Sequence, residues 1–247
     1  MTYVSICKRK RRSRAILSGR YSLPMGAFAV SQVISTCISL PFDISLQSNP
    51  TVFQFIISEL ATAIISLLYI VLKGGQAYVH LNMARGKNAS IADVFRYFSR
   101  RPDRFILSGI ILIGILLPVV LPAAVVTILA LTNGTIGIYI AVFAIWAVTL
   151  IPIIVISLTY SLTIYLLVER PSASLPDIFR ESRQMMKGNK RSRFYLGLSF
   201  FGMYLLCILS LGIGFLWIIP YRNQAYTEFY LSIKGEQRGE VRKEWEK

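Results

Sequence analysis

Three charged residues within apolar stretches are the strongest candidates for chemistry in this sequence. Glu59 is the only acidic residue well inside the first five apolar runs, and Arg222 and Glu228 lie in the last one. A charged side chain near the bilayer midplane costs ~2.5 kcal/mol or more, so such residues often mark proton or substrate pathways. Glu59 lies in the outer half of its helix, where access to water lowers that cost. Two roles are therefore open for Glu59: part of a translocation path, or an acid that reaches the membrane interface.

A seven-residue pattern occurs twice, at 90–96 and at 174–180, 84 positions apart. In each copy a Ser precedes an Asp by three positions, which is the spacing of a capping box at a helix start. Apolar residues and arginines follow the first Ser at helical spacing, which favours a short helix lying on the inner leaflet. The pattern is interpreted either as a structural connector or as a docking surface for a partner or a lipid headgroup. Its candidate docking residues are Ser90, Asp93, Phe95, Arg96, Ser174, Asp177, Phe179 and Arg180.

Known catalytic motifs are missing from the chain. It contains no HExxH motif, no glycine-rich phosphate loop, no nucleophile elbow and no paired intramembrane aspartates, which disfavours an enzyme. We expect no cofactor and no metal. Cys7, Cys37 and Cys207 match no metal-ligand spacing, so three free thiols are expected. His80 is the single histidine, and we expect it to be an interfacial side chain.

The elements that must position these residues are long apolar helices. Hydrophobic residues make up 54% of the 247 positions, and about 20 apolar residues suffice to cross a bilayer. The fold class is therefore an all-α, polytopic membrane protein. Pro118 and Pro122 predict a kink in the third span, and the 33-residue fourth run must tilt, bend near Pro152 or project into the cytoplasm. Six transmembrane helices are expected at about 21–40, 52–72 with a helical extension to 84, 105–131, 136–168, 194–210 and 215–233.

The positive charges predict the orientation of these spans. The net charge is +15, and the 27 Lys and Arg residues all fall in four segments, at 1–20, 73–104, 169–193 and 221–247. Basic residues collect in cytoplasmic loops, so both termini are expected in the cytoplasm of a plasma-membrane protein. This distribution makes nucleic acid an improbable partner and anionic inner-leaflet lipids an expected one. A five-span alternative, with 194–219 as one span, would place the six basic residues of the tail outside.

The spans are expected to form three pseudo-repeated helical hairpins joined by cytoplasmic amphipathic connectors. Residues 15–20 stand before the first span as 185–190 stand before the fifth. The expected organisation is a basic cytoplasmic N-terminus at 1–20, a six-span membrane domain at 21–233 and a charged cytoplasmic tail at 234–247. The first span has full membrane length, which favours a retained helix over a cleaved signal peptide.

Three motifs in this order resemble a bacterial membrane family, described as domain of unknown function nine-seven-five. They are Arg85-Gly86 with Ser90-x-x-Asp93-Val94-Phe95, then Met186-Lys187-Gly188-Asn189, then Leu211-Gly212-Ile213-Gly214 with Pro220-Tyr221 and Phe229-Tyr230. The resemblance covers most of the chain. The N-terminal copy departs from it, with Ser18-Gly19-Arg20 where the family often has Lys-Gly-Asn. The resemblance implies a six-span plasma-membrane protein, and it brings no activity and no catalytic residues.

The leading hypothesis for the function is a non-enzymatic accessory or immunity-type partner of a membrane transport or envelope system. It rests on the repeated basic connectors and on the missing catalytic motifs. The alternative is a small transporter or lipid-handling membrane protein that uses the Glu59 region and the polar last segment. A membrane enzyme is the third possibility.

Overall fold

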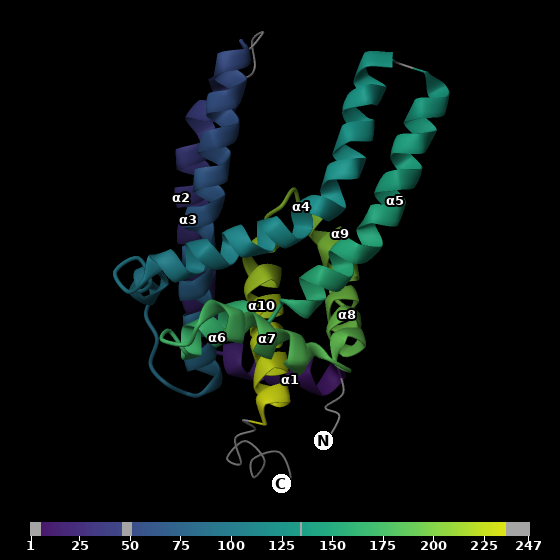
Figure 1. Ribbon diagram of the computed structural model, residues 1–247. Coiled ribbons are helices and arrows are strands. Elements are labelled where there is room, and N and C mark those ends of the chain that lie inside the picture. The colour runs from purple at the N-terminus through teal and green to yellow at the C-terminus, as the bar shows by residue number, and fades with distance from the viewer. Residues whose placement is uncertain (1–5, 46–50, 134, 236–247) are drawn as a thin grey trace.

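The computed structural model describes residues 6–45, 51–133 and 135–235, and every regular element in these ranges is helical (Figure 1). Parts of the expected outer turns, at 46–50 and 134, and most of the charged tail, at 236–247, lie outside the described residues. The elements are α1 (Ile6–Leu17), α2 (Ser22–Ser45), α3 (Val52–Ala84), η1 (Ile91–Phe95), α4 (Pro102–Asn133), α5 (Ile136–Thr159), α6 (Thr163–Glu169), α7 (Leu175–Met186), α8 (Lys190–Leu198), α9 (Phe201–Leu209) and α10 (Phe215–Lys234).

The long helix α3 has the bounds that the sequence predicts for the second span with its extension. Thr51 caps its start, because the Gln54 amide donates to the Thr51 hydroxyl and the Thr51 amide donates to the Gln54 side chain. At the other end, Gly86 adopts a left-handed conformation with φ of 65°, and the Lys87 amide donates to the Asn82 carbonyl. A glycine in this conformation ends a helix without steric cost.

The third and fourth apolar runs form a second hairpin, α4 with α5. Figure 1 shows α4 changing direction in its middle part, where Pro118 and Pro122 interrupt the regular helical hydrogen bonds, so the predicted kink is confirmed. The Trp146 indole donates to the Thr127 hydroxyl at 3.0 Å and joins the two helices. The fourth apolar run stays helical through Pro152 as α5. It is interrupted at Tyr160–Leu162, where the chain turns into α6.

The fifth apolar run is divided into α8 and α9, and a break at 210–214 separates it from α10. Leu211 and Gly212 have φ values of 52° and 90°, which confirms the predicted break at this glycine-containing segment. Within the described part of the chain, five helical segments are long and apolar enough to cross a membrane: Ser22–Phe42, Ile56–Ala84, Pro102–Ala130, Ile136–Glu169 and Lys190–Leu209. The chain is therefore a membrane protein. α10, which carries Arg222 and Glu228, has the length of a span but not the composition of the other five.

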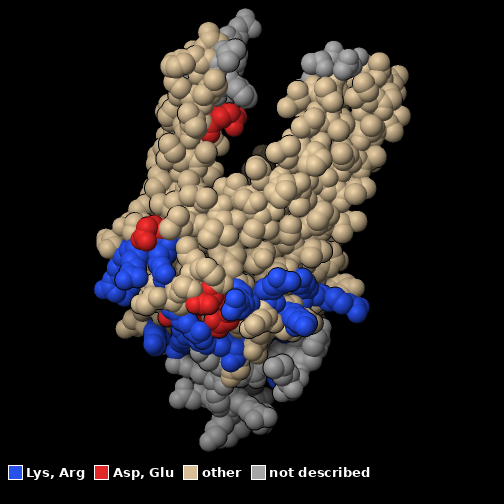
Figure 2. All heavy atoms as spheres, viewed as in Figure 1, with Lys and Arg blue, Asp and Glu red and all other residues tan. Residues whose placement is uncertain are grey.

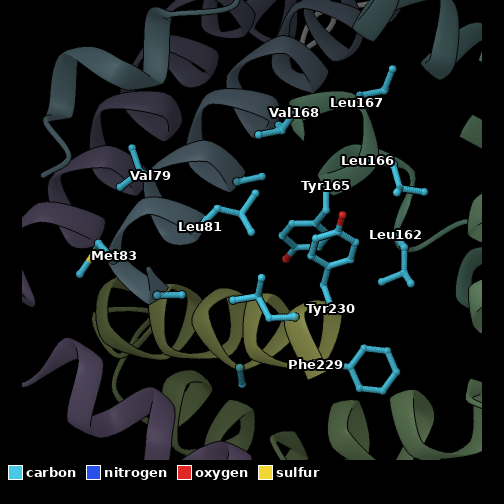
Figure 3. Close-up of a cluster of buried hydrophobic side chains, with 14 of the residues drawn as sticks. Val79, Leu81, Met83, Leu162, Tyr165, Leu166, Leu167, Val168, Phe229 and Tyr230 are labelled. Atoms are coloured by element: carbon cyan, nitrogen blue, oxygen red, sulfur yellow. The ribbon is translucent and has the colours of Figure 1, made fainter. Parts of the chain in front are cut away.

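The buried core lies at one end of the molecule instead of halfway along the spans. It draws on α1, the C-terminal half of α3, η1, α6, α7, α8 and α10, with Ala27 of α2 and Phe105 of α4, whereas the upper parts of the two hairpins expose most of their side chains. Figure 3 shows the centre of this core, where the rings of Tyr165 and Tyr230 stack between α6 and α10. Their centroids are 5.1 Å apart. We call this part of the molecule the base.

Charge and hydrophobicity separate along the molecule in the same way. On the face shown in Figure 2, Lys and Arg side chains form a basic belt across the base, and the two arms above it are almost wholly uncharged. Exposed apolar residues on these arms, such as Phe53, Ile140 and Phe143, are 64–78% accessible. Exposure of this extent suits contact with lipid chains. The base is therefore the polar end of a membrane protein.

Candidate functional site

Glu59 lies on the exposed face of α3, among the apolar residues of that arm. Its neighbours along the helix, Phe53, Ile56 and Leu60, are 50–71% accessible. Within the described residues, no hydrogen bond or ion pair involves its carboxylate. The structure therefore does not bring Glu59 together with Arg222 and Glu228, which lie in the base.

A carboxylate that the sequence analysis missed, Glu169 at the end of α6, is bound by donors from two other helices. Arg85, the C-cap of α3, forms an ion pair with one carboxylate oxygen. The other oxygen accepts the Tyr230 hydroxyl and the Lys234 ammonium, each at 2.5 Å. The Glu169 side chain is only 8% exposed. It therefore ties together the ends of α3, α6 and α10, and such buried charges are costly unless paired in this way.

Glu228, a predicted candidate, forms a second buried ion pair. Its carboxylate lies 2.8 Å from Nε of Arg12, and its side chain is 3% exposed. This contact joins α1 to α10 and gives the basic N-terminal helix a structural role. Arg9 supports the same packing, because it donates to the Ser192 hydroxyl at 2.8 Å and lies over the Phe229 ring.

His80 is buried, so the expectation of an interfacial histidine is wrong. Its Nδ1 is 2.8 Å from Oε1 of Gln224, and both side chains are almost fully inaccessible. The expectation failed because α3 continues into the base, where α10 covers it. Buried polar groups of this kind need a partner, and each residue supplies one to the other.

The first copy of the repeated pattern forms the predicted capping box. The Ser90 hydroxyl accepts the Ala92 amide at 3.3 Å, and the Asp93 carboxylate accepts the Ser90 amide at 2.9 Å. The helix that follows, η1, is a single 3₁₀ segment. Phe95 is 40% exposed, while Arg96 lies over the Tyr78 ring and is 3.6 Å from Asp93.

The backbone of η1 lies directly against α3. A Cβ built on Gly75 would be 2.0 Å from the Val94 carbonyl oxygen, so only glycine fits at this position. Next to this contact, the Tyr97 hydroxyl donates to the Val168 carbonyl at 3.2 Å. Burial raises the pKa of Tyr97 to about 12, which keeps the phenol a neutral donor.

The second copy caps a longer helix but has different surroundings. The Ser174 hydroxyl accepts the Asp177 amide at 3.3 Å and starts α7. Phe179 is 8% exposed and packs against Tyr160, whereas Phe95 at the corresponding position is exposed. Among the candidate residues of the second copy, Ser174, Asp177 and Arg180 are exposed. The two patterns therefore share their caps, while only part of each remains accessible for docking.

Arg222 lies among aromatic rings instead of beside an acid. It donates to the Tyr204 hydroxyl, and its guanidinium carbon is 5.7 Å from the centroid of that ring and 5.5 Å from that of Tyr226. These partners could not be predicted from local spacing, because they come from α9 and from the next turn of α10. Glu169, by contrast, could have been predicted from the sequence, since it lies 84 positions after Arg85, which is the offset of the repeated pattern.

Comparison with known proteins gives a family and no characterised relative. No curated protein and no solved structure matches the chain. One family model, described as Protein of unknown function (DUF975), matches residues 5–237. This match covers nearly the whole chain, including the base, the arms and all three motifs. The chain therefore belongs to the DUF975 family.

Proposed function

We propose that this protein is a non-enzymatic accessory of a membrane transport or envelope system, of the kind that binds and regulates or protects a larger assembly. The observation that supports this most is the construction of the base. Its two buried glutamates, Glu169 and Glu228, both form ion pairs between helices. What it leaves exposed is a set of basic and aromatic side chains around the η1 segment. The role fits a family for which no activity is established.

We further propose six spans in the plasma membrane, as three related hairpins with both termini in the cytoplasm. The break at Leu211–Gly214 supports a return of the chain along α10 toward the base. The basic belt across the face of the base in Figure 2 supports a cytoplasmic placement of that end, because positive charge collects on the cytoplasmic side. In this orientation η1 lies at the inner leaflet, with Ile91 and Phe98 toward the acyl chains, its arginines near anionic headgroups and Phe95 left for a protein partner.

The accessory role is tested by quantitative purification from native membranes in a mild detergent. We expect a protein partner in stoichiometric amount with the wild type, and much less of it with the double variant Phe95→Ala/Arg180→Ala. Both side chains are exposed, so the abundance and the melting temperature of the variant should stay near wild type. Leu129→Ala, at a 53% exposed position high on α4, is the matched control and should retain the partner. A chain that purifies alone, with both variants unchanged, contradicts the accessory role.

A small transporter or lipid-handling protein is the second candidate, and the exposed acid on an apolar arm favours it. Glu59→Gln keeps the size and hydrogen bonding of the side chain but removes its charge. A translocation path would lose activity in this variant at normal expression and stability. The readout is the phenotype of a deletion strain, challenged first with membrane-active peptides. Wild-type behaviour of Glu59→Gln would count against the transporter.

A further inference from the structure

Three cations lie at the borders of uncharged stretches of the chain. Lys73 ends the uncharged stretch 60–72, and Arg193 and Arg222 bound the uncharged stretch 194–221. A border between an apolar run and a charged segment marks the level of the lipid headgroups. The three residues belong to α3, α8 and α10, which are far apart in sequence.

The fold brings these three cations together around tyrosine rings. The guanidinium carbon of Arg193 is 3.1 Å from the centroid of Tyr226, and that of Arg222 is 5.5 Å from the same ring. Nζ of Lys73 is 5.0 Å from the centroid of the Tyr69 ring, and both side chains lie within electrostatic range of Arg222. Tyrosines are typical of the interfacial zone of membrane proteins, where their rings and hydroxyls meet different surroundings.

No acid balances this positive charge. Within the described ranges, the carboxylates that form ion pairs bind other cations, and none pairs with Lys73, Arg193 or Arg222. In addition, Nε of Arg193 and Nε of Arg222 are both buried and find no acceptor among the described residues. Like charges repel, and buried donors without acceptors are rare, so the cluster lacks an anion that accepts hydrogen bonds.

We propose that Lys73, Arg193 and Arg222 bind the phosphate group of an anionic phospholipid of the inner leaflet. Phosphate oxygens accept several hydrogen bonds at once and suit the planar donor array of arginine. Basic pockets between membrane helices on the cytoplasmic side recognise lipid headgroups in this way. Exposed apolar side chains of α9, including Leu205 and Leu206, lie on the same helix as Tyr204 and offer a surface for the acyl chains. This site rests on the proposed placement of the base at the inner leaflet and names its lipid partner.

The test uses the purified full-length chain and native mass spectrometry in detergent, with phosphatidylglycerol and phosphatidylcholine as probes. Wild type should retain phosphatidylglycerol in preference to the zwitterionic lipid. Lys73→Gln/Arg222→Gln should weaken phosphatidylglycerol binding by ~10-fold or more, because each lost contact joins two charged groups. Arg183→Gln/Lys187→Gln removes the same charge from exposed positions of α7 and should bind like wild type. Lys73→Arg/Arg222→Lys, which conserves the charge, should keep most of the preference.

Three results would overturn the site. The first is an equal loss of binding in the α7 control, which would mean general charge attraction. The second is displacement of phosphatidylglycerol by excess inorganic phosphate, which would assign the cluster to a free anion. The third is an absence of lipid preference in wild type. If the double variant does not fold, the single variant Lys73→Gln is measured instead. This side chain is exposed, so its replacement should leave the fold intact while weakening phosphatidylglycerol binding. Lipid binding in detergent needs no protein partner, so its failure is distinguishable from failure of the accessory role.

Discussion

Arg85 and Glu169 form an ion pair across the base, and they are separated by the same 84 positions as the two copies of the repeated pattern. Each residue ends a helix, α3 in one case and α6 in the other, and each is followed within five positions by a capping serine. Two residues separated by the offset of the repeated pattern therefore carry opposite charges and contact each other.

Replacing Glu169 should weaken the fold more than replacing an ordinary surface acid. Glu169→Gln leaves Arg85 and Lys234 without a charged acceptor, and we expect a loss of ~3 kcal/mol in the free energy of unfolding. Glu181→Gln is the control, since its partner Arg170 is half exposed and such pairs contribute ~1 kcal/mol or less. Thermal and denaturant unfolding in detergent measure both. Equal losses of unfolding free energy in the two variants would show that Glu169 does not join the three helices.

Gly75→Ala should separate η1 from α3. The added methyl group would meet the Val94 carbonyl at 2.0 Å, and relief requires a movement of the backbone of η1. We expect a loss of ~2 kcal/mol or more and increased proteolysis near Phe95. Gly114→Ala, in open space on α4, should leave the melting temperature unchanged or slightly raised. A stable Gly75→Ala protein with η1 still protected would show that the contact is not tight.

Loss of either capping serine should cost about the same. Ser90→Ala and Ser174→Ala each remove an acceptor for a first-turn amide, which is worth ~1 kcal/mol. Ser99→Ala, on the exposed segment after η1, serves as the control. A loss of partner binding at unchanged stability would instead identify the pattern as a docking site.

The Arg12–Glu228 pair should show strong coupling between its members. Arg12→Gln leaves a carboxylate buried and unpaired, for which we expect ~3 kcal/mol of destabilisation, while Arg20→Gln at an exposed position should be neutral. The double variant Arg12→Gln/Glu228→Gln should recover a large part of the loss, because no charge is left buried. Additive losses in the double variant would argue that the pair is not formed.

The proposed topology places positions 2 and 247 on the cytoplasmic side. In a cysteine-free background, a single cysteine at either position should resist an impermeant thiol reagent in intact cells and react after permeabilisation. A cysteine at position 46, in the first outer connection, is the positive control. Labelling of position 247 in intact cells would establish five spans.

The sequence predicts the helices of this molecule better than its base. The bounds of α3, the kink of α4, the caps at Ser90 and Ser174 and the break at 211–214 are all local features, and short-range spacing is enough to find them. The turn at Tyr160–Leu162 and the burial of His80 depend on which helices pack against the chain there. Such contacts between distant segments leave no local pattern. Glu169 is an intermediate case, since the repeat offset points to it once Arg85 is considered.

Because the buried core is confined to one end, the two hairpins extend from the base as separate arms. The arm formed by α2 and α3 and the arm formed by α4 and α5 diverge from the base (Figure 1), so little packing energy holds their tips together. With arms of about 30 Å, a rotation of roughly 5° at the base moves a tip by about 3 Å. A small rearrangement near η1 and Gly75 would therefore cause a larger displacement at the far ends of the arms. Conversely, a change in bilayer thickness or lateral pressure that moved those ends would act on the base, where the Arg85–Glu169 pair lies.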